Sequence, residues 1–171
     1  GTLTRRHDDL GEAVRELQRE LGRENPEYQF VTTFIGILDV ESGALEFVCA
    51  GHDAPLLLRR GEVLKIDTGA VSGPPLCALA DYPYHSGHQQ LAVGDLLCLF
   101  TDGVSEASDG QRMFGRERLA EVLLAAGPEA SVTARATAIR DAVRQFEAGR
   151  PPFDDLTVLL ACWHGRSSSE R

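Results

Sequence analysis

Apolar residues recur at three- and four-residue spacing in three stretches of the chain, and this period is typical of amphipathic helices. The first stretch predicts a helix over residues 8–22, with Asp8 or Asp9 as its N-cap and Gly22 as its C-terminal stop. Near the other end, the same spacing predicts helices over 115–126 and 131–148. Ser131 is expected to cap the last of these, and Gly149 with Pro151 and Pro152 to end it.

Between the helices the pattern changes to short runs rich in β-branched and aromatic residues, which indicate strands. Four such runs are separated by short turns and predict an antiparallel meander, and residues 67–87 are expected to form a loop rich in Gly and Pro. Strands are also expected at 89–93, 96–100 and 153–163. The four runs of the predicted meander cover 30–40, 44–50, 56–59 and 62–66. Since strands and helices are segregated along the chain, the order predicts an α+β fold with antiparallel sheets.

Composition narrows the class of protein. The 171 residues suit one domain, and the formal net charge of -9 argues against a nucleic-acid groove, which depends on clustered Lys and Arg. The four cysteines include no C-x-x-C pair, so they predict buried free thiols in place of a disulfide framework or a zinc site. No signal peptide or membrane-length apolar run is present, so the prediction is a cytoplasmic chain without direct membrane contact.

Two carboxylate positions are candidates for chemistry. Asp102 follows the buried run 96–100, and Asp154 with Asp155 opens the last predicted strand. In an antiparallel pair the end of one strand lies beside the start of its neighbour, so Asp102 and Asp154 could come close together. Close carboxylates repel unless a cation lies between them, and Mg²⁺ or Mn²⁺ there would lower the pKa of a bound water. Taken alone, each motif is also compatible with an ordinary Asp-containing turn.

The histidines and Ser105 are weaker candidates. His52 follows Gly51 in a tight turn, where it could act as a general acid or contact a substrate, although a structural role is the simpler interpretation. No G-x-S-x-G elbow surrounds Ser105, and the chain contains neither a Walker A loop nor a dinucleotide fingerprint.

From Phe30 onward the sequence resembles the SpoIIE/RsbU branch of the PPM (protein phosphatase 2C-like) metal-dependent serine/threonine phosphatases. The resemblance rests on FVTTFIGILDVESGALEFVCAGHDAPLLLRRG, SGPPL, LAVGDLLCLFTDGVSEA, FGRERL and FDDLTVLLA, in this order. The TDG block and the DD-x-T strand are specific in combination and weak when taken singly.

The resemblance implies an antiparallel β-sandwich flanked by helices, with a two-metal Mn²⁺ or Mg²⁺ centre that activates water against phosphoserine or phosphothreonine. The family's acidic ligands carry over to Asp102 and Asp154, with a secondary role for Asp155. Gly51 and His52 fall on the family's GH turn, where they and Gly103 are expected to shape an active-site loop.

The family's upstream D-x-x-G-H-G motif is not found in this sequence. The expected organisation is therefore a partial PPM domain over residues 1–165, followed by a disordered tail over 166–171. An upstream sensor or regulatory domain is expected in the parent protein.

Three functions remain open at this point. The first is a phosphatase acting on a phosphoprotein such as an anti-sigma-factor antagonist. The second is a catalytically incomplete fragment or pseudophosphatase that binds proteins, and the third is a metal-dependent hydrolase of another phosphate ester.

Overall fold

The computed structural model describes residues 9–23, 25–152 and 154–165. The chain divides into two compact units, one built from residues 1–54 and 67–91 and the other from 55–66 and 92–171. The expected tail over 166–171 lies outside the described residues. None of the described helices is long and apolar enough to cross a membrane.

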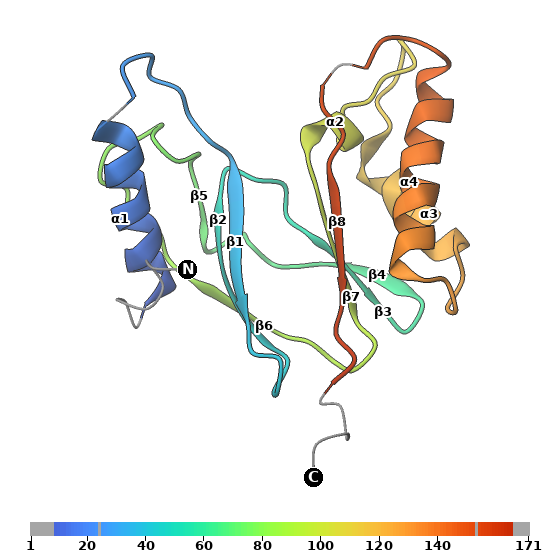
Figure 1. Cartoon of the computed structure of the whole chain (residues 1–171), viewed down its shortest axis with the longest axis horizontal. Helices are drawn as coiled ribbons and strands as arrows, with labels where there is room; N and C mark the ends of the chain where they lie inside the picture. Colours follow the sequence, from blue (N-terminus) through green and yellow to red (C-terminus); the bar gives the residue numbers. More distant parts are fainter. Residues whose placement is uncertain (1–8, 24, 153, 166–171) are drawn as a thin grey trace. The chain divides into compact units, whose positions relative to one another are not determined.

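The first unit combines one helix with a small sheet (Figure 1). Strand β2 pairs antiparallel with β1 and with β6, and over two residues it pairs parallel with β5. The elements are α1 (Leu10–Arg23), β1 (Thr33–Leu38), β2 (Ala44–Ala50), β5 (Ser72–Gly73) and β6 (Gly87–Gln90). Asp9 is the N-cap of α1, because its Oδ1 accepts from the amide of Gly11 at 2.7 Å.

The core of this unit lies between α1 and β2. Leu10 and Val14 on the helix pack with Val48 and Ala50 on the strand. Burial of such apolar faces supplies most of the stability of a short helix, which would be marginal in isolation. The predicted helix is therefore confirmed with its apolar face buried over the first turns, although Leu21 is 42% exposed and the helix continues one residue beyond Gly22.

The second unit is a four-stranded antiparallel sheet in the order β4-β3-β7-β8 with three helices. Figure 1 shows α3 and α4 together on one face of this sheet. The elements are β3 (Leu56–Arg59), β4 (Glu62–Lys65), β7 (Leu96–Phe100), α2 (Asp102–Ser105), α3 (Gly115–Ala125), α4 (Val132–Glu147) and β8 (Val158–Cys162).

Strand β7 is central to this unit. Cys98 and Phe100 are buried in one cluster with Leu119 and Leu123 of α3 and Ile139 of α4. The near-continuous apolar run of β7 is explained by this burial, since a strand covered by helices and flanked by two strands has few exposed positions. Ser131 caps α4 as predicted, and its side chain accepts from the amide of Ala134.

The α+β prediction is confirmed, and four of its details are corrected. The meander prediction is wrong, because β3 pairs with β4 and β7 while β2 pairs with β1, β5 and β6. Residues 51–55 carry no strand and take the chain from one sheet to the other, an arrangement that local periodicity does not encode. The expected strand 89–93 lies at Gly87–Gln90, and the last strand begins at Val158. The loop 67–87 contains the short strand β5.

Candidate metal centre at the ends of two paired strands

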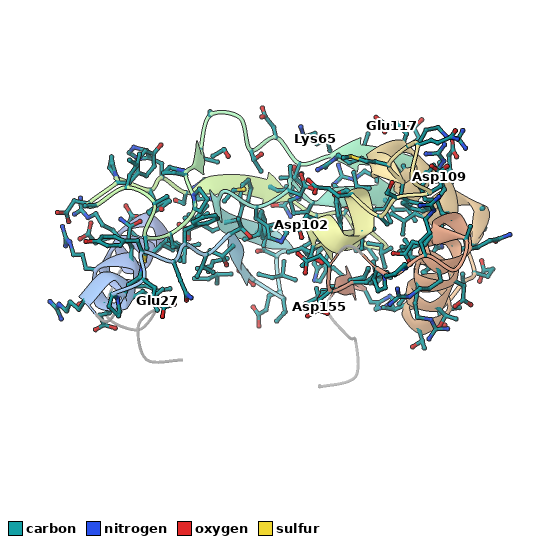
Figure 2. All side chains as sticks on the ribbon, turned by 90° about the horizontal axis from the view of Figure 1, so that it is seen from above. Glu27, Lys65, Asp102, Asp109, Glu117 and Asp155 are labelled. Atoms are coloured by element: carbon teal, nitrogen blue, oxygen red, sulfur yellow. The ribbon has the colours of Figure 1, made fainter. Side chains whose placement is uncertain are left out.

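Strands β7 and β8 are antiparallel neighbours, and Phe100 lies opposite Val158. The end of β7 therefore meets the start of β8, as expected from the positions of the two aspartate motifs. Asp102 begins the short helix α2, and Asp154 and Asp155 precede β8. Figure 2 labels Asp102 and Asp155, which both lie beside the ribbon of α2.

The closest approach between the two motifs is through the main chain at Gly103. A Cβ atom on Gly103 would lie 2.4 Å from the carbonyl oxygen of Asp155 and 3.2 Å from that of Asp154. Real Cβ atoms do not approach backbone oxygens so closely. Any residue larger than glycine at this position would therefore displace the neighbouring main chain. The glycine of TDG therefore lets the first motif lie against the second.

The side chain of Thr101 forms hydrogen bonds across the same junction. Its hydroxyl donates to the carbonyl of Asp155 at 3.0 Å and accepts from the amide of Thr157 at 3.1 Å. The main-chain amide of Thr101 also donates to the carbonyl of Thr157. An N-cap threonine usually accepts from an amide of its own helix, but Thr101 makes no such bond, because its hydroxyl is engaged with the DD-x-T segment.

The expected Asp-Gly turn is instead the first turn of a helix. The carbonyl of Asp102 accepts from the amide of Glu106 at 2.7 Å. The side chain of Asp102 accepts from the amide of Gly103, and that of Asp154 accepts from the amide of Asp155 at 2.7 Å. Both carboxylates are exposed and each has one oxygen fixed by the following residue, so they are oriented yet accessible.

The donor set suits a hard divalent cation by type. Asp102 and Asp154 offer exposed carboxylate oxygens, and protein-bound Mg²⁺ commonly takes one or two carboxylates and retains several waters. Across residues 9–23, 25–152 and 154–165, no group of three or more His, Cys, Asp or Glu side chains is arranged to hold a metal ion. The described residues therefore provide some, but not all, of the ligands that such a metal centre needs.

The Gly51–His52 turn belongs to the first unit and has its own structural basis. Gly51 has a φ of +69°, and a Cβ there would lie 2.6 Å from the ring of Pro75. His52 Nδ1 lies 2.8 Å from the carbonyl oxygen of its neighbour Asp53, and the carbonyl of His52 accepts from the thiol of Cys49. The conformation of the turn therefore requires a glycine at position 51, and the ring of His52 lies against the main chain of its neighbour. Both residues thus have a structural explanation.

An ion pair with a buried aspartate and a partly exposed arginine stabilises the other end of β7. Asp95, which is 2% exposed, accepts from both Nε and a terminal nitrogen of Arg59 on β3. It also accepts from the amide of Ala92, so the turn before β7 is held to the neighbouring strand. Hydrogen bonding to the carboxylate of Asp95 raises the pKa of the Arg59 guanidinium.

Comparison with known proteins identifies the family. The family described as Stage II sporulation protein E (SpoIIE) matches residues 1–164. The chain belongs to the SpoIIE family. Protein IcfG of Synechocystis is 30% identical over 135 residues, which is 76% of this chain and 20% of that protein. The chain therefore spans about a fifth of this curated relative's length.

Solved structures show the same fold for this SpoIIE-family chain. The structure of the RsbU and RsbW domains of Rv1364c from Mycobacterium tuberculosis matches with a TM-score of 0.72 and 22% identity, covering 92% of this chain and 44% of that one. The Mn-presoaked phosphatase domain of SpoIIE from Bacillus subtilis matches with a TM-score of 0.68 and 17% identity, covering 93% of this chain and 68% of that one. The chain thus has the fold of the SpoIIE/RsbU PP2C-type phosphatase domains.

Sequence reasoning missed Thr101 and Thr157. Both threonines are inside the two motifs, one before Asp102 and one two residues after Asp155. A signal was therefore present, but the contact between them depends on the register of β7 against β8, which the sequence does not state.

Proposed function

We propose that this chain carries metal-dependent serine/threonine protein phosphatase chemistry and hydrolyses phosphoserine or phosphothreonine on a regulatory partner protein. One observation carries the proposal: Gly103 and Thr101 hold the TDG segment directly against the main chain of Asp154 and Asp155. Two exposed carboxylates at one strand junction, in a chain of this family and fold, are a reasonable basis for such chemistry.

Asp102 and Asp154 would hold the Mn²⁺ or Mg²⁺ ion, with a secondary role for Asp155. When bound, the ion supplies a hydroxide near neutral pH and offsets negative charge on the phosphate. The protein's own residues fix the carboxylates: the amides of Gly103 and Asp155 each hold one carboxylate oxygen, and the Thr101 hydroxyl keeps the two segments in register. Gly51 and His52 are proposed to shape an active-site loop, with no role as ligands.

The proposed substrate is a phosphoprotein of the anti-sigma-factor-antagonist type, and an upstream sensor domain in the parent protein would control the activity. The related chain from M. tuberculosis combines RsbU and RsbW domains, which supports partner-switching signalling as the setting. A cytoplasmic location is proposed as well, and the four cysteines, all of them free, are compatible with a reducing compartment.

Isothermal titration with Mn²⁺, together with hydrolysis of p-nitrophenyl phosphate and a phosphoserine peptide, tests the proposal. Asp102→Asn and Asp154→Asn should each weaken Mn²⁺ binding by about tenfold or more, because a neutral amide replaces an anionic ligand. Asp141→Asn is the matched control, since Asp141 is an exposed aspartate on α4 outside the junction. A chain extended by the upstream part of its reading frame should be measured in parallel.

A second candidate is a catalytically incomplete or pseudophosphatase module that binds proteins. It is favoured by the lack of a three-ligand group among the described residues. If neither the chain nor its extended form binds Mn²⁺ at millimolar concentration or hydrolyses either substrate, the phosphatase proposal is overturned and this second candidate is supported.

A further inference from the structure

One buried side chain of the first unit has a donor without an acceptor. Gln18 on α1 is 3% exposed, and its Nε2 is buried with no hydrogen-bond partner among the described residues. Its Oε1, in contrast, accepts from the hydroxyl of Tyr84 at 2.9 Å and from the amide of Cys77 at 3.2 Å. Exchanging the two atoms would set Nε2 against the N–H of Cys77, donor against donor, so these contacts fix the orientation of the side-chain amide.

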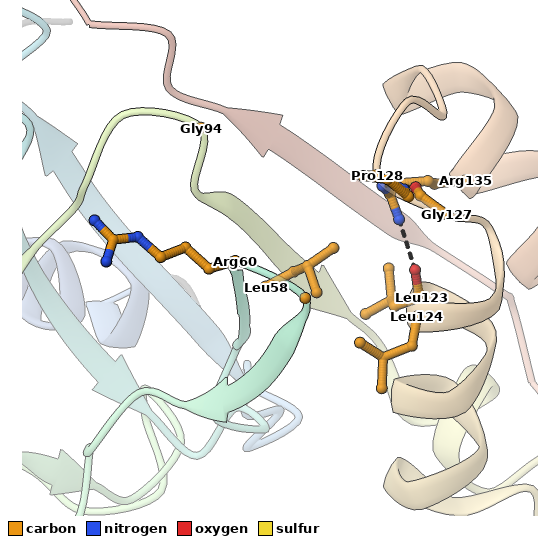
Figure 3. Close-up of a pocket in the computed structure, with 9 residues that line it drawn as sticks. Leu58, Arg60, Gly94, Leu123, Leu124, Gly127, Pro128 and Arg135 are labelled. Carbon is orange, nitrogen blue, oxygen red and sulfur yellow. Dashed lines mark hydrogen bonds between the residues drawn. The ribbon is translucent and has the colours of Figure 1, made fainter.

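Two comparably buried polar side chains of the second unit are hydrogen-bonded. Glu147 accepts from Arg144 at 3.0 Å. Arg135 donates to the carbonyls of Leu123 and Gly127, and the bond to Leu123 is the dashed line in Figure 3. A buried N–H without an acceptor lowers stability, so the unbonded donor of Gln18 calls for an explanation, such as a group that is absent from the unmodified chain.

Cys77, in the loop after β5, lies directly beside Gln18. Its amide donates to Oε1 of Gln18, and its Sγ lies 3.9 Å from the main-chain carbonyl oxygen of the same residue. Cys77 also has a φ of +67°, in the left-handed region that residues other than glycine rarely adopt. A thiol in an unfavourable backbone conformation, next to a buried donor without an acceptor, indicates a use for the sulfur.

The other three thiols are protected from reagents in solution. Cys49 and Cys98 are buried, and burial also raises the pKa of the partly exposed Cys162. Because the thiolate is the nucleophile, a raised pKa leaves less of it near neutral pH. Cys77 is partly exposed, so an oxidant from solution is expected to react there first.

We propose that Cys77 is a site of reversible oxidation by hydrogen peroxide, and that the buried amide of Gln18 holds the sulfenic acid formed there. The sulfur attacks one peroxide oxygen: an S–O bond forms, the O–O bond breaks, sulfur loses two electrons, and the other oxygen leaves as water with the thiol proton. The new oxygen is a stronger acceptor than a thiol sulfur, so it can accept from Nε2 of Gln18. Two molecules of a small thiol reverse the step and form their own disulfide and water.

Two measurements on the unaltered chain test the proposal. After treatment with about 0.1 mM hydrogen peroxide, dimedone trapping and mass spectrometry should find the adduct at Cys77 in about tenfold or greater excess over Cys162. In spectra of the ¹⁵N-labelled chain, peroxide should shift the side-chain amide signals of Gln18, and dithiothreitol should restore them. Neither measurement requires a variant, so the proposal can be tested even if a substitution at Gln18 prevents folding.

A matched pair of variants isolates the donor. Gln18→Glu keeps an acceptor for Cys77 and removes Nε2, so the sulfenic acid should be over-oxidised about fivefold faster. Gln111→Glu makes the same change at an exposed position and should leave its lifetime unchanged. The proposal is overturned if Cys162 is trapped as readily as Cys77, if the Gln18 signals do not respond, or if the two variants have equal lifetimes. These readouts do not involve phosphate hydrolysis, so they are independent of the phosphatase assays.

Discussion

The hydroxyl of Thr101 donates to the main-chain carbonyl of Asp155 over 3.0 Å. The same oxygen accepts from the amide of Thr157, so one side chain links the segment that carries Asp102 to the segment that carries Asp154. A hydrogen-bonded side chain at such a junction limits how far the two carboxylates can move apart. If these carboxylates hold a metal ion, Thr101 is a positioning residue for them.

Thr101→Val should therefore weaken Mn²⁺ binding by about tenfold, because the isosteric valine offers no bonds to Asp155 and Thr157. The free energy of unfolding should fall by about 1–2 kcal/mol. Thr101→Ser keeps the hydroxyl and should recover most of the affinity. Titration calorimetry and urea unfolding measure the two effects, and equal Mn²⁺ affinity in the valine and serine variants would contradict the positioning role.

Gly103→Ala should separate the two motifs. The new methyl group would lie 2.4 Å from the carbonyl oxygen of Asp155, so α2 or the segment before β8 has to move. We expect a loss of about 1–3 kcal/mol in the free energy of unfolding, together with weaker Mn²⁺ binding.

Gly22→Ala is the matched control for this substitution. Gly22 is also in a helix, and a Cβ there would meet nothing within 4 Å. That variant should be neutral or up to about 1 kcal/mol more stable, because alanine is the better helix former. A Gly103→Ala protein as stable as the Gly22→Ala protein would mean that the close approach at Gly103 is not present in solution.

Asp95→Ala should be among the more damaging single substitutions in the second unit. It removes the carboxylate that Arg59 and the amide of Ala92 share, and leaves both donors without this acceptor. Loss of about 2–4 kcal/mol is expected from breaking a largely buried pair. Arg140→Ala, which breaks the exposed pair with Asp141, should cost less than about 0.5 kcal/mol. Urea unfolding compares the two, and similar losses would contradict the importance of burial.

The four thiols should react with iodoacetamide in a defined order. Cys49 and Cys98 are buried, and burial raises the pKa of both, that of Cys98 to about 12. Cys77 and Cys162 are both partly exposed, but burial raises the pKa of Cys162, so Cys77 should be alkylated first at pH 8. Mass spectrometry of timed digests measures the order. Labelling of Cys98 before unfolding would show that the sheet of the second unit opens readily.

Stability should fall with rising pH in alkaline solution, and Tyr84 should contribute to the fall. Burial raises the pKa of Tyr84 to about 12. Between the ordinary tyrosine pKa near 10 and this value the unfolded chain releases a proton that the folded chain retains, so the stabilising contribution present below pH 10 is lost as pH rises. Tyr84→Phe should show a smaller loss of melting temperature over this range, and identical slopes for the two proteins would refute the contribution.

The sequence predicted most of this molecule where local patterns are sufficient. The helices α1, α3 and α4 follow from apolar spacing, whereas α2 was expected to be a turn. The adjacency of the two aspartate motifs follows from the rule that antiparallel neighbours meet end to start. The pairing of β3 with β7 could not be predicted, because partner choice among apolar strands depends on which faces bury each other in the whole domain.

In the candidate site, too, some features could be predicted from local sequence and others depend on how the strands pair. Asp102 and Asp154 were selected from their place at the ends of an apolar strand and before another. The role of Thr101 depends on hydrogen bonds of 3.0 and 3.1 Å across the junction, and that of Gly103 on the close approach of the Asp155 carbonyl. Both are set only after the strands have paired.

The contact between Gly103 and the Asp154–Asp155 segment is made largely of main-chain atoms. Such a contact is insensitive to most side-chain replacements around it, provided that the glycine stays and the chain path is kept. The junction can thus tolerate extensive divergence in its surroundings while its spacing stays the same. In a saturation library of residues 99–108, position 103 should accordingly accept glycine alone, whereas the exposed position of Glu106 should accept many substitutions.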